Sequence, residues 1–195
     1  DLAHILAARA LWQNPPMRMR IAVEGRLGTG MSAKDLALWI IHILGNDGGI
    51  GTFIEYAGSA VRALSMEQRM TLCNLAIEGG ARGGMIAPDD TTYEYLAGRP
   101  YAPAGAMWDR ALVYWRTLST DDGAGFDREV TLDAARVSPQ VSWGTNPSQV
   151  VAVDDAVPDP LDEPDAMRRE SMQAALDYMD LRPGTRLSDV PIDRV

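Results

Sequence analysis

Cysteine is nearly absent from this sequence, whose 195 residues include only Cys73. A single cysteine cannot form an intrachain disulfide, which favours a reducing compartment, here the cytoplasm. It also cannot by itself hold an iron–sulfur cluster, which normally needs several cysteine ligands. We therefore expect no metal site built from this chain alone.

Long apolar runs and positive charge are scarce as well. The longest apolar stretch, residues 36–44, falls far short of the roughly 20 residues that span a bilayer, so no membrane partner is expected. Acidic residues outnumber basic ones by 27 to 18, which gives a net charge of −9. Such a surface repels phosphate backbones, so no nucleic-acid partner is expected. The sequence starts at Asp1 with no charged leader. We therefore expect that the chain begins partway into a secondary-structure element and that it carries no signal peptide.

The remaining composition is typical of a globular chain. Hydrophobic residues make up 46% and charged residues 23%, which is enough for one substantial core, and we expect a single domain over residues 1–195. Helix-like segments alternate with short strand-like ones. This alternation predicts an α/β domain of layered α/β/α type with a mainly parallel sheet. Prolines, glycines and acids make residues 98–165 irregular.

Periodicity and capping residues locate the expected elements. Residues 17–23 alternate with a period of two, which predicts a half-buried strand. Ser32 can cap a helix whose apolar face carries Leu36, Trp39, Ile40, Ile43 and Leu44. Further helices are expected at 2–13, 65–79, 89–96, 107–118 and 165–179, strands at 53–56, 130–132 and 150–153, a buried strand at 84–87, a solvated linker at 154–165, and a terminal strand from Pro191.

The helix expected after Ser65 carries two stripes of different character. Ser65 and Gln68 have the spacing of a capping box. One stripe is expected to face the core and consists of Met66, Met70, Cys73 and Ile77. The adjacent stripe, at i, i+3 and i+7, consists of Thr71, Asn74 and Glu78. An amide and a carboxylate on one face can bind a small polar ligand, but this spacing alone is more typical of a solvated helix face.

Residues 45–51 form a glycine-rich run, G-N-D-G-G-I-G, that invites comparison with a phosphate-binding loop. Phosphate loops follow a strand and open a helix, whereas this run follows a helix and precedes a strand. We interpret it as a helix stop and a tight turn. His42 is interpreted as a structural residue, and Cys73 as part of the core rather than a nucleophile.

Short motifs occur in a fixed order along nearly the whole chain. Residues 64–78 read L-S-M-E-Q-R-M-T-L-C-N-L-A-I-E, and later motifs are A-P-D-D-T-T at 87–92, G-R-P-Y-A-P at 98–103, Y-W-R-T-L at 114–118, V-T-L-D-A-A at 130–135, P-Q-V-S-W-G-T-N-P at 139–147 and Y-M-D-L-R-P-G-T at 178–185. Together they resemble the large subunits of isopropylmalate isomerases, a branch of the aconitase family. Gln68 and Ser148 stand where that pattern commonly has glycine. These departures leave the resemblance to the family intact but leave the exact substrate open.

The resemblance implies an aconitase-type fold and a place in a hydro-lyase. Such an enzyme isomerises 2-isopropylmalate to 3-isopropylmalate by dehydration and rehydration in leucine biosynthesis. The resemblance implies catalytic roles for Asn74 and Glu78, and substrate contacts for Thr145 and Asn146. It also implies a [4Fe-4S] cluster whose ligands lie outside this chain, so the isolated fragment is expected to be inactive. The implied partners are the remaining domains of the large subunit, a small swivel-domain subunit and a small dicarboxylic hydroxy acid.

Two alternatives stay open. A related iron–sulfur hydro-lyase acting on another 2-alkylmalate or a citraconate-like acid would share these motifs. A cluster-free binding module made from an enzyme domain would share the fold without the reaction. A parent reading frame that continues into the family's G-S-C-T-N and C-x-x-C segments would exclude the module.

Overall fold

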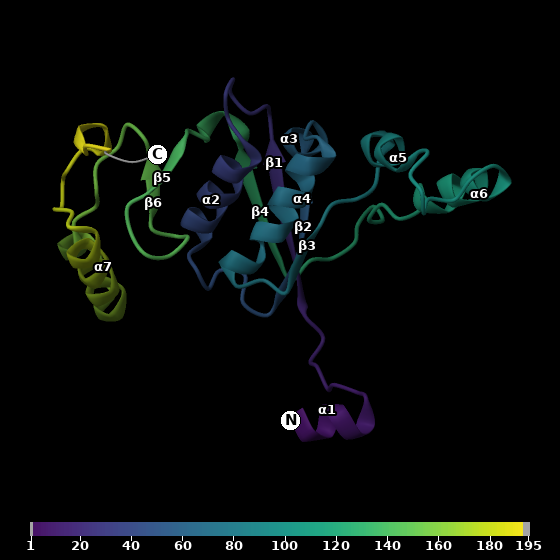
Figure 1. The fold of residues 1–195 in the computed structure, drawn as a ribbon, viewed down its shortest axis with the longest axis horizontal. Helices are drawn as coiled ribbons and strands as arrows, with labels where there is room; N and C mark the ends of the chain where they lie inside the picture. Colours follow the sequence, from purple (N-terminus) through teal and green to yellow (C-terminus); the bar gives the residue numbers. More distant parts are fainter. Residues whose placement is uncertain (1, 193–195) are drawn as a thin grey trace.

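A parallel four-stranded sheet forms the centre of the computed structural model, which describes residues 2–192 (Figure 1). Its strands lie in the order β3 (Gly83–Met85), β2 (Thr52–Ala57), β1 (Met17–Glu24) and β4 (Arg128–Asp133), and every pair is parallel. β1 has the predicted period of two, because Met19, Ile21 and Val23 are fully buried. The predicted α/β class with a mainly parallel sheet is confirmed.

Helices α2 (Ala33–Leu44), α3 (Ser59–Arg62) and α4 (Met66–Leu75) pack against one face of this sheet. The core between them joins Met19 and Ile21 to Leu36 and Leu72. α2 begins where predicted, because the Ser32 hydroxyl accepts a hydrogen bond from the Asp35 N–H. The apolar face predicted for α2 was wrong at Ile43, which is 44% exposed. The helix buries Ala37 and Ile41 instead, so its buried face is rotated relative to the prediction.

A smaller unit beside α2 contains the antiparallel pair β5 (Gln140–Ser142) and β6 (Val150–Ala152) and the helix α7 (Ala166–Met179). Its own core consists of Trp143, Val157, Ala175 and Leu176. The helix start was predicted correctly, because the Asp165 side chain accepts a hydrogen bond from the Arg168 N–H. β5 was not predicted, because Val141 is its only apolar residue.

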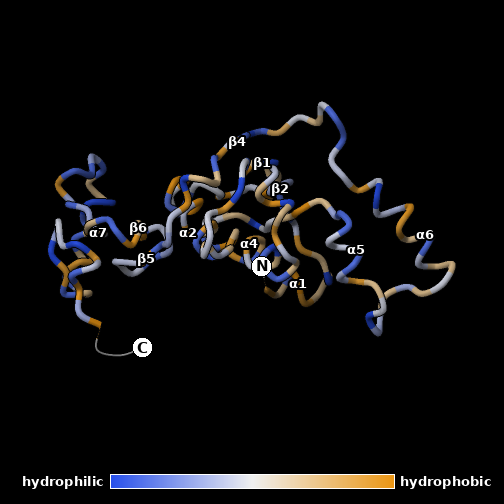
Figure 2. Tube along the Cα trace, turned by 90° about the horizontal axis from the view of Figure 1, so that it is seen from above, coloured by the Kyte–Doolittle hydropathy of each residue, from blue (hydrophilic) through white to orange (hydrophobic). Residues whose placement is uncertain are grey.

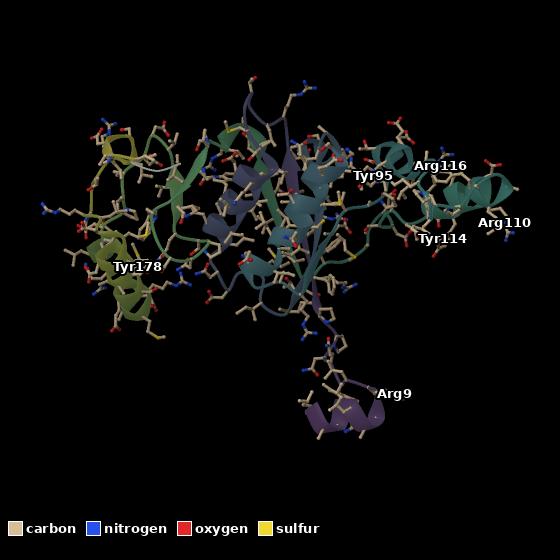
Figure 3. All side chains as sticks on the ribbon, viewed as in Figure 1. Arg9, Tyr95, Arg110, Tyr114, Arg116 and Tyr178 are labelled. Atoms are coloured by element: carbon tan, nitrogen blue, oxygen red, sulfur yellow. The ribbon has the colours of Figure 1, made fainter. Side chains whose placement is uncertain are left out.

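Two helical segments project from this body (Figures 1 and 3). On one side are α5 (Asp90–Leu96) and α6 (Ala106–Trp115), where Trp115 stacks on Tyr93 at 6.2 Å and meets Trp108 edge to face at 5.5 Å. Figure 3 shows Arg110 and Tyr114 on α6, well away from the sheet. The other projection is α1 (Leu2–Ala8). No helix among residues 2–192 combines the length and apolar character needed to cross a bilayer.

Several predicted elements differ from the structure. The first helix ends at Ala8 rather than residue 13, and with none of its residues buried it has no packing to extend it. The strand predicted as buried at 84–87 is the edge strand β3, with Met85 55% exposed. The predicted linker buries Val157 and Pro160 against neighbouring structure. Pro191 and Ile192 are not in a strand, and the rest of the predicted terminal strand lies outside the described residues.

Candidate functional site

Glu78 lies just beyond the C-terminal end of α4. The predicted capping box is confirmed at the start of the helix, where the Ser65 N–H donates to Gln68 Oε1 at 2.9 Å and the Gln68 N–H donates to Ser65 Oγ at 3.4 Å. The α-helix stops at Leu75, and a 3₁₀ turn, η1 (Ile77–Gly79), carries Glu78. Gly80 then takes the left-handed conformation, with φ of 83°, that ends the turn.

The core stripe predicted for α4 was wrong at Met70 and Ile77. Met70 is 47% exposed and Ile77 is 62% exposed, whereas Arg69, Leu72 and Ala76 are buried. The physical reason is Arg69, whose guanidinium is enclosed by polar partners. It donates to Asp89, to Thr92 and to the backbone carbonyl oxygens of residues 62 and 64. Because its polar partners satisfy the buried Arg69 side chain, α4 can bury the face that carries this arginine, and the spacing of apolar residues does not predict that face.

Cys73 is half-buried at the margin of the core, as its predicted structural role requires. It packs closely against β3, because a Cβ on Gly84 would lie only 3.0 Å from Cys73 Cα. Burial raises the pKa of the Cys73 thiol above its ordinary value. Since the thiolate is the reactive form, this environment disfavours nucleophilic chemistry.

An open groove of about 580 Å³ brings Glu78 together with residues from a distant part of the sequence. One wall comes from α2 and the end of α4, and the other from β5, β6 and the loop between them. The groove is lined by Lys34, Leu38, Leu75, Glu78, Gln140, Ser142, Gly144, Thr145, Asn146, Pro147 and Val150. Glu78 is the only acid in this lining and Lys34 the only cation, and Lys34 is also the only lysine of the sequence.

The loop from Trp143 to Gln149 is held by the buried side chain of Gln149, which is 5% exposed. Gln149 Oε1 accepts hydrogen bonds from the N–H groups of Thr145, at 2.6 Å, and Asn146, at 3.2 Å. Gly144 leaves room for this carboxamide, because a Cβ there would overlap Gln149 Oε1. One buried amide thus fixes the backbone of both residues predicted to contact substrate.

The side chains predicted as site residues are not equivalent in the structure. The carboxamide oxygen of Asn146 accepts hydrogen bonds from Asn46 Nδ2, Ser148 N and Ser148 Oγ at 2.9–3.1 Å, so it joins the loop to the end of α2. Thr145 is exposed at the groove. Asn74 is exposed on α4 but does not line the groove. The fold therefore gathers Glu78, Thr145 and Asn146, and leaves Asn74 outside this lining.

Asp35 connects the start of α2 to the opposite wall of the groove. One of its carboxylate oxygens accepts from the Ser32 N–H and hydroxyl, and the other accepts from the Gln140 N–H at 2.9 Å. Burial acts to raise the pKa of Asp35, but these hydrogen bonds outweigh it and hold the pKa below its ordinary value. Sequence reasoning missed Lys34, Asp35 and Gln149 as parts of the site.

The described residues do not fit an iron–sulfur cluster. Among residues 2–192, no group of three or more His, Cys, Asp or Glu side chains is placed to hold a metal ion. The one thiol packs against the backbone of β3 rather than facing the groove wall.

The sequence model of the Aconitase family (aconitate hydratase) matches residues 1–195. The chain belongs to the aconitase family. It is 53% identical over all 195 of its residues to a 3-isopropylmalate dehydratase large subunit from Roseiflexus castenholzii (strain DSM 13941 / HLO8), of which it spans 41%. The chain therefore corresponds to less than half of that curated relative.

Proposed function

We propose that this chain is one domain of a hydro-lyase large subunit, and that its groove forms part of the site for a small dicarboxylic hydroxy acid. The observation that carries this proposal is the shared groove, where Glu78 faces a wall containing Thr145 and Asn146 although 67 residues separate Glu78 from Thr145. The 53% identity to a 3-isopropylmalate dehydratase large subunit supports 2-isopropylmalate and 3-isopropylmalate as the substrate pair, in leucine biosynthesis.

The groove offers complementary groups to such a substrate. The Lys34 ammonium attracts a carboxylate, while Thr145, Ser142 and Gln140 present polar atoms for further carboxylate or hydroxyl oxygens. Dehydration removes a hydroxyl group and the proton on the neighbouring carbon, and the hydroxyl leaves as water once it gains a proton. Glu78, as the only acid of the groove lining, is the group of this chain that can hold or deliver that proton.

The whole enzyme requires more than this chain provides. We propose that a [4Fe-4S] cluster, bound by cysteines outside this chain, supplies Lewis-acid chemistry at the substrate when it is present. A small subunit completes the site, consistent with the relative's designation as a large subunit. The enzyme is proposed to work in the cytoplasm, as a heterodimer of large and small subunits. Asn74, which is exposed on α4, is proposed to have a catalytic role in the assembled enzyme.

The test is Glu78→Gln in the full-length two-subunit enzyme. Loss of a positioned proton-handling group should lower kcat by about 10²–10⁴-fold. Circular dichroism and iron content should match those of the wild type, because Glu78 is exposed and no described residue depends on it for a hydrogen bond. A kcat close to that of the wild type, with the cluster fully occupied, would show that Glu78 is only a solvated residue.

The matched control is Glu94→Gln on α5. Glu94 is exposed and lies outside the groove, so the substitution removes one negative charge without touching the proposed site. Its kcat and KM should equal those of the wild type. Glu67 is a poorer control because its carboxylate accepts a hydrogen bond from the Ser65 hydroxyl that caps α4.

A further inference from the structure

A second cavity adjoins the loop that forms one wall of the groove. It has a volume of about 360 Å³ and is bordered by the end of α2, by the loop from Trp143 to Gln149 and by the first turns of α7. β5 and β6 lie between α2 and α7 in two perpendicular views (Figures 1 and 2). We call this cavity the α7 pocket. Of its lining, only Asn146 also belongs to the groove, so the two cavities present different side chains.

Two hydrogen-bond donors of this loop are unused within the described chain, although the side chains that carry them are almost fully buried. Gln149 is 5% exposed and Trp143 is 3% exposed. Gln149 Oε1 accepts from the N–H groups of Thr145 and Asn146, but neither Gln149 Nε2 nor Trp143 Nε1 donates to another described residue. Neither nitrogen is sealed in the interior, since the described part of the chain has such an unpartnered atom only at Arg20 Nε. Both side chains line the α7 pocket, which can therefore offer two donors to a ligand.

Charged side chains of both signs surround the pocket. Arg168 is on the first turn of α7, while Asp47 and Glu163 lie in the turn after α2 and in the segment before α7. None of the three takes part in the ion pairs of residues 2–192. His42, whose Nδ1 lies 3.2 Å from the Ser148 carbonyl oxygen, is the remaining ionisable group of the lining. Two carboxylates and one guanidinium disfavour a dianion and favour a ligand that carries one positive and one negative group.

Apolar side chains complete the lining. Trp143 and Met172 pack in the core of the smaller unit, and Pro158 also lines the pocket. An aliphatic group held against these side chains is removed from water, which favours its binding. Ligand pockets span roughly 300–1,000 Å³, so the α7 pocket lies at the small end of the range. It therefore suits a ligand of about the size of an amino acid.

We propose that the α7 pocket binds a free α-amino acid with an aliphatic side chain. The ligand carboxylate pairs with Arg168 and accepts a hydrogen bond from Gln149 Nε2. The ligand ammonium lies near Asp47 and Glu163, and the aliphatic side chain packs against Trp143. This site goes beyond the proposed function, which concerns the groove, and ligand binding there does not require the reaction to occur.

Isothermal titration calorimetry of L-leucine into the full-length two-subunit enzyme tests this binding. Three analogues each lack one feature of the probe: isocaproate has no ammonium group, isoamylamine has no carboxylate, and glycine has no aliphatic side chain. We expect saturable binding of leucine. Each analogue should bind about tenfold more weakly or worse, because it leaves one set of pocket groups without its partner.

Substitutions locate the bound amino acid. Arg168→Gln and Glu163→Gln should each weaken leucine binding by about tenfold, because each removes a charge that the zwitterion meets. The matched controls are Arg110→Gln and Glu170→Gln, whose positions lie outside the pocket lining, and both should bind leucine as the wild type does. Lys34→Gln, in the groove, should also bind leucine with unchanged affinity. Circular dichroism checks that each variant is folded, and the analogues test the same point in the wild type.

Every other outcome overturns the proposal. Absence of saturable leucine binding would mean that the α7 pocket holds no amino acid. Isocaproate or isoamylamine binding as tightly as leucine would exclude recognition of a zwitterion, and equal binding of glycine would exclude the aliphatic class. Loss of binding in Lys34→Gln would place leucine in the groove. Calorimetry is independent of turnover, so failure of this proposal is distinguishable from failure of the proposed function, which the kcat of Glu78→Gln tests.

Discussion

Arg69 of α4 and Asp89, the N-cap of α5, form a two-pronged ion pair with nitrogen–oxygen distances of 2.6 and 2.7 Å. The Arg69 side chain is 4% exposed and the Asp89 side chain 34% exposed. The pair joins the projecting α5–α6 segment to the helix layer that carries Glu78. It is the principal polar connection between these two parts of the described chain.

Asp89→Asn should destabilise the protein by about 3 kcal/mol, because it leaves the buried Arg69 charge without its counterion. Water can reach the partly exposed Asp89 position, so we expect the loss of unfolding free energy to lie at the lower end of the range for broken buried ion pairs. Urea unfolding measures the effect as a lowered midpoint with little change in slope. The control is Asp90→Asn, at the exposed neighbouring position. If both substitutions cost the same, the ion pair contributes nothing specific.

The same pair predicts how stability depends on pH. Burial acts to raise the pKa of Asp89, but the hydrogen bonds and charge of Arg69 outweigh it and hold the pKa below the usual value of 3.8. The folded state therefore binds this proton less readily than the unfolded state. The stabilisation is fully present above about pH 3.8 and is lost as the pH falls through the lowered pKa. Unfolding free energy should thus fall less steeply below that pH in Asp89→Asn than in the wild type.

Local rules predicted those elements whose determinants lie close together in sequence. The period of two in β1 and the capping residues Ser32 and Ser65 need only a few neighbours, and all three predictions were confirmed. The rotation of α4 could not be predicted, because the buried Arg69 is intelligible only with Asp89, 20 residues later. The wall of the groove depends in the same way on long-range packing.

Resemblance and physics contributed differently to the candidate site. Spacing alone described the stripe with Asn74 and Glu78 as a solvated face, and both residues are indeed exposed. Only the family motifs indicated a site there. Neither approach indicated that Gln149 would be buried, because a glutamine in a loop carries no local signal for burial. Its role appears only when its carboxamide meets the backbone of Thr145 and Asn146.

Gly144→Ala should disturb the wall of the groove. The added methyl group would overlap the Gln149 carboxamide, so either this side chain or the loop must move. Overpacking of this kind costs about 1–3 kcal/mol. We expect thermal unfolding to shift downwards and KM of the full enzyme to rise. Gly125→Ala is the control, since a Cβ there meets nothing within 4 Å. Wild-type stability and KM in Gly144→Ala would mean that Gln149 does not fix this loop.

Lys34→Gln tests whether the groove attracts an anionic substrate. Lys34 is the only cation of the groove lining, so a dicarboxylate entering the groove loses its nearest positive charge in this variant. If the ammonium contacts a carboxylate equally in the bound and transition states, KM rises by about tenfold, corresponding to roughly 1.4 kcal/mol, and kcat stays the same.

Lys34→Arg keeps the charge and should restore most of the affinity. Arg110→Gln, on the projecting helix α6, removes a distant positive charge and should leave KM unchanged. Raising the ionic strength should reduce the difference in KM between the wild type and Lys34→Gln, because salt screens an exposed charge. An unchanged KM in Lys34→Gln would place the substrate carboxylates out of reach of α2, and the groove would then bind substrate through its polar wall alone.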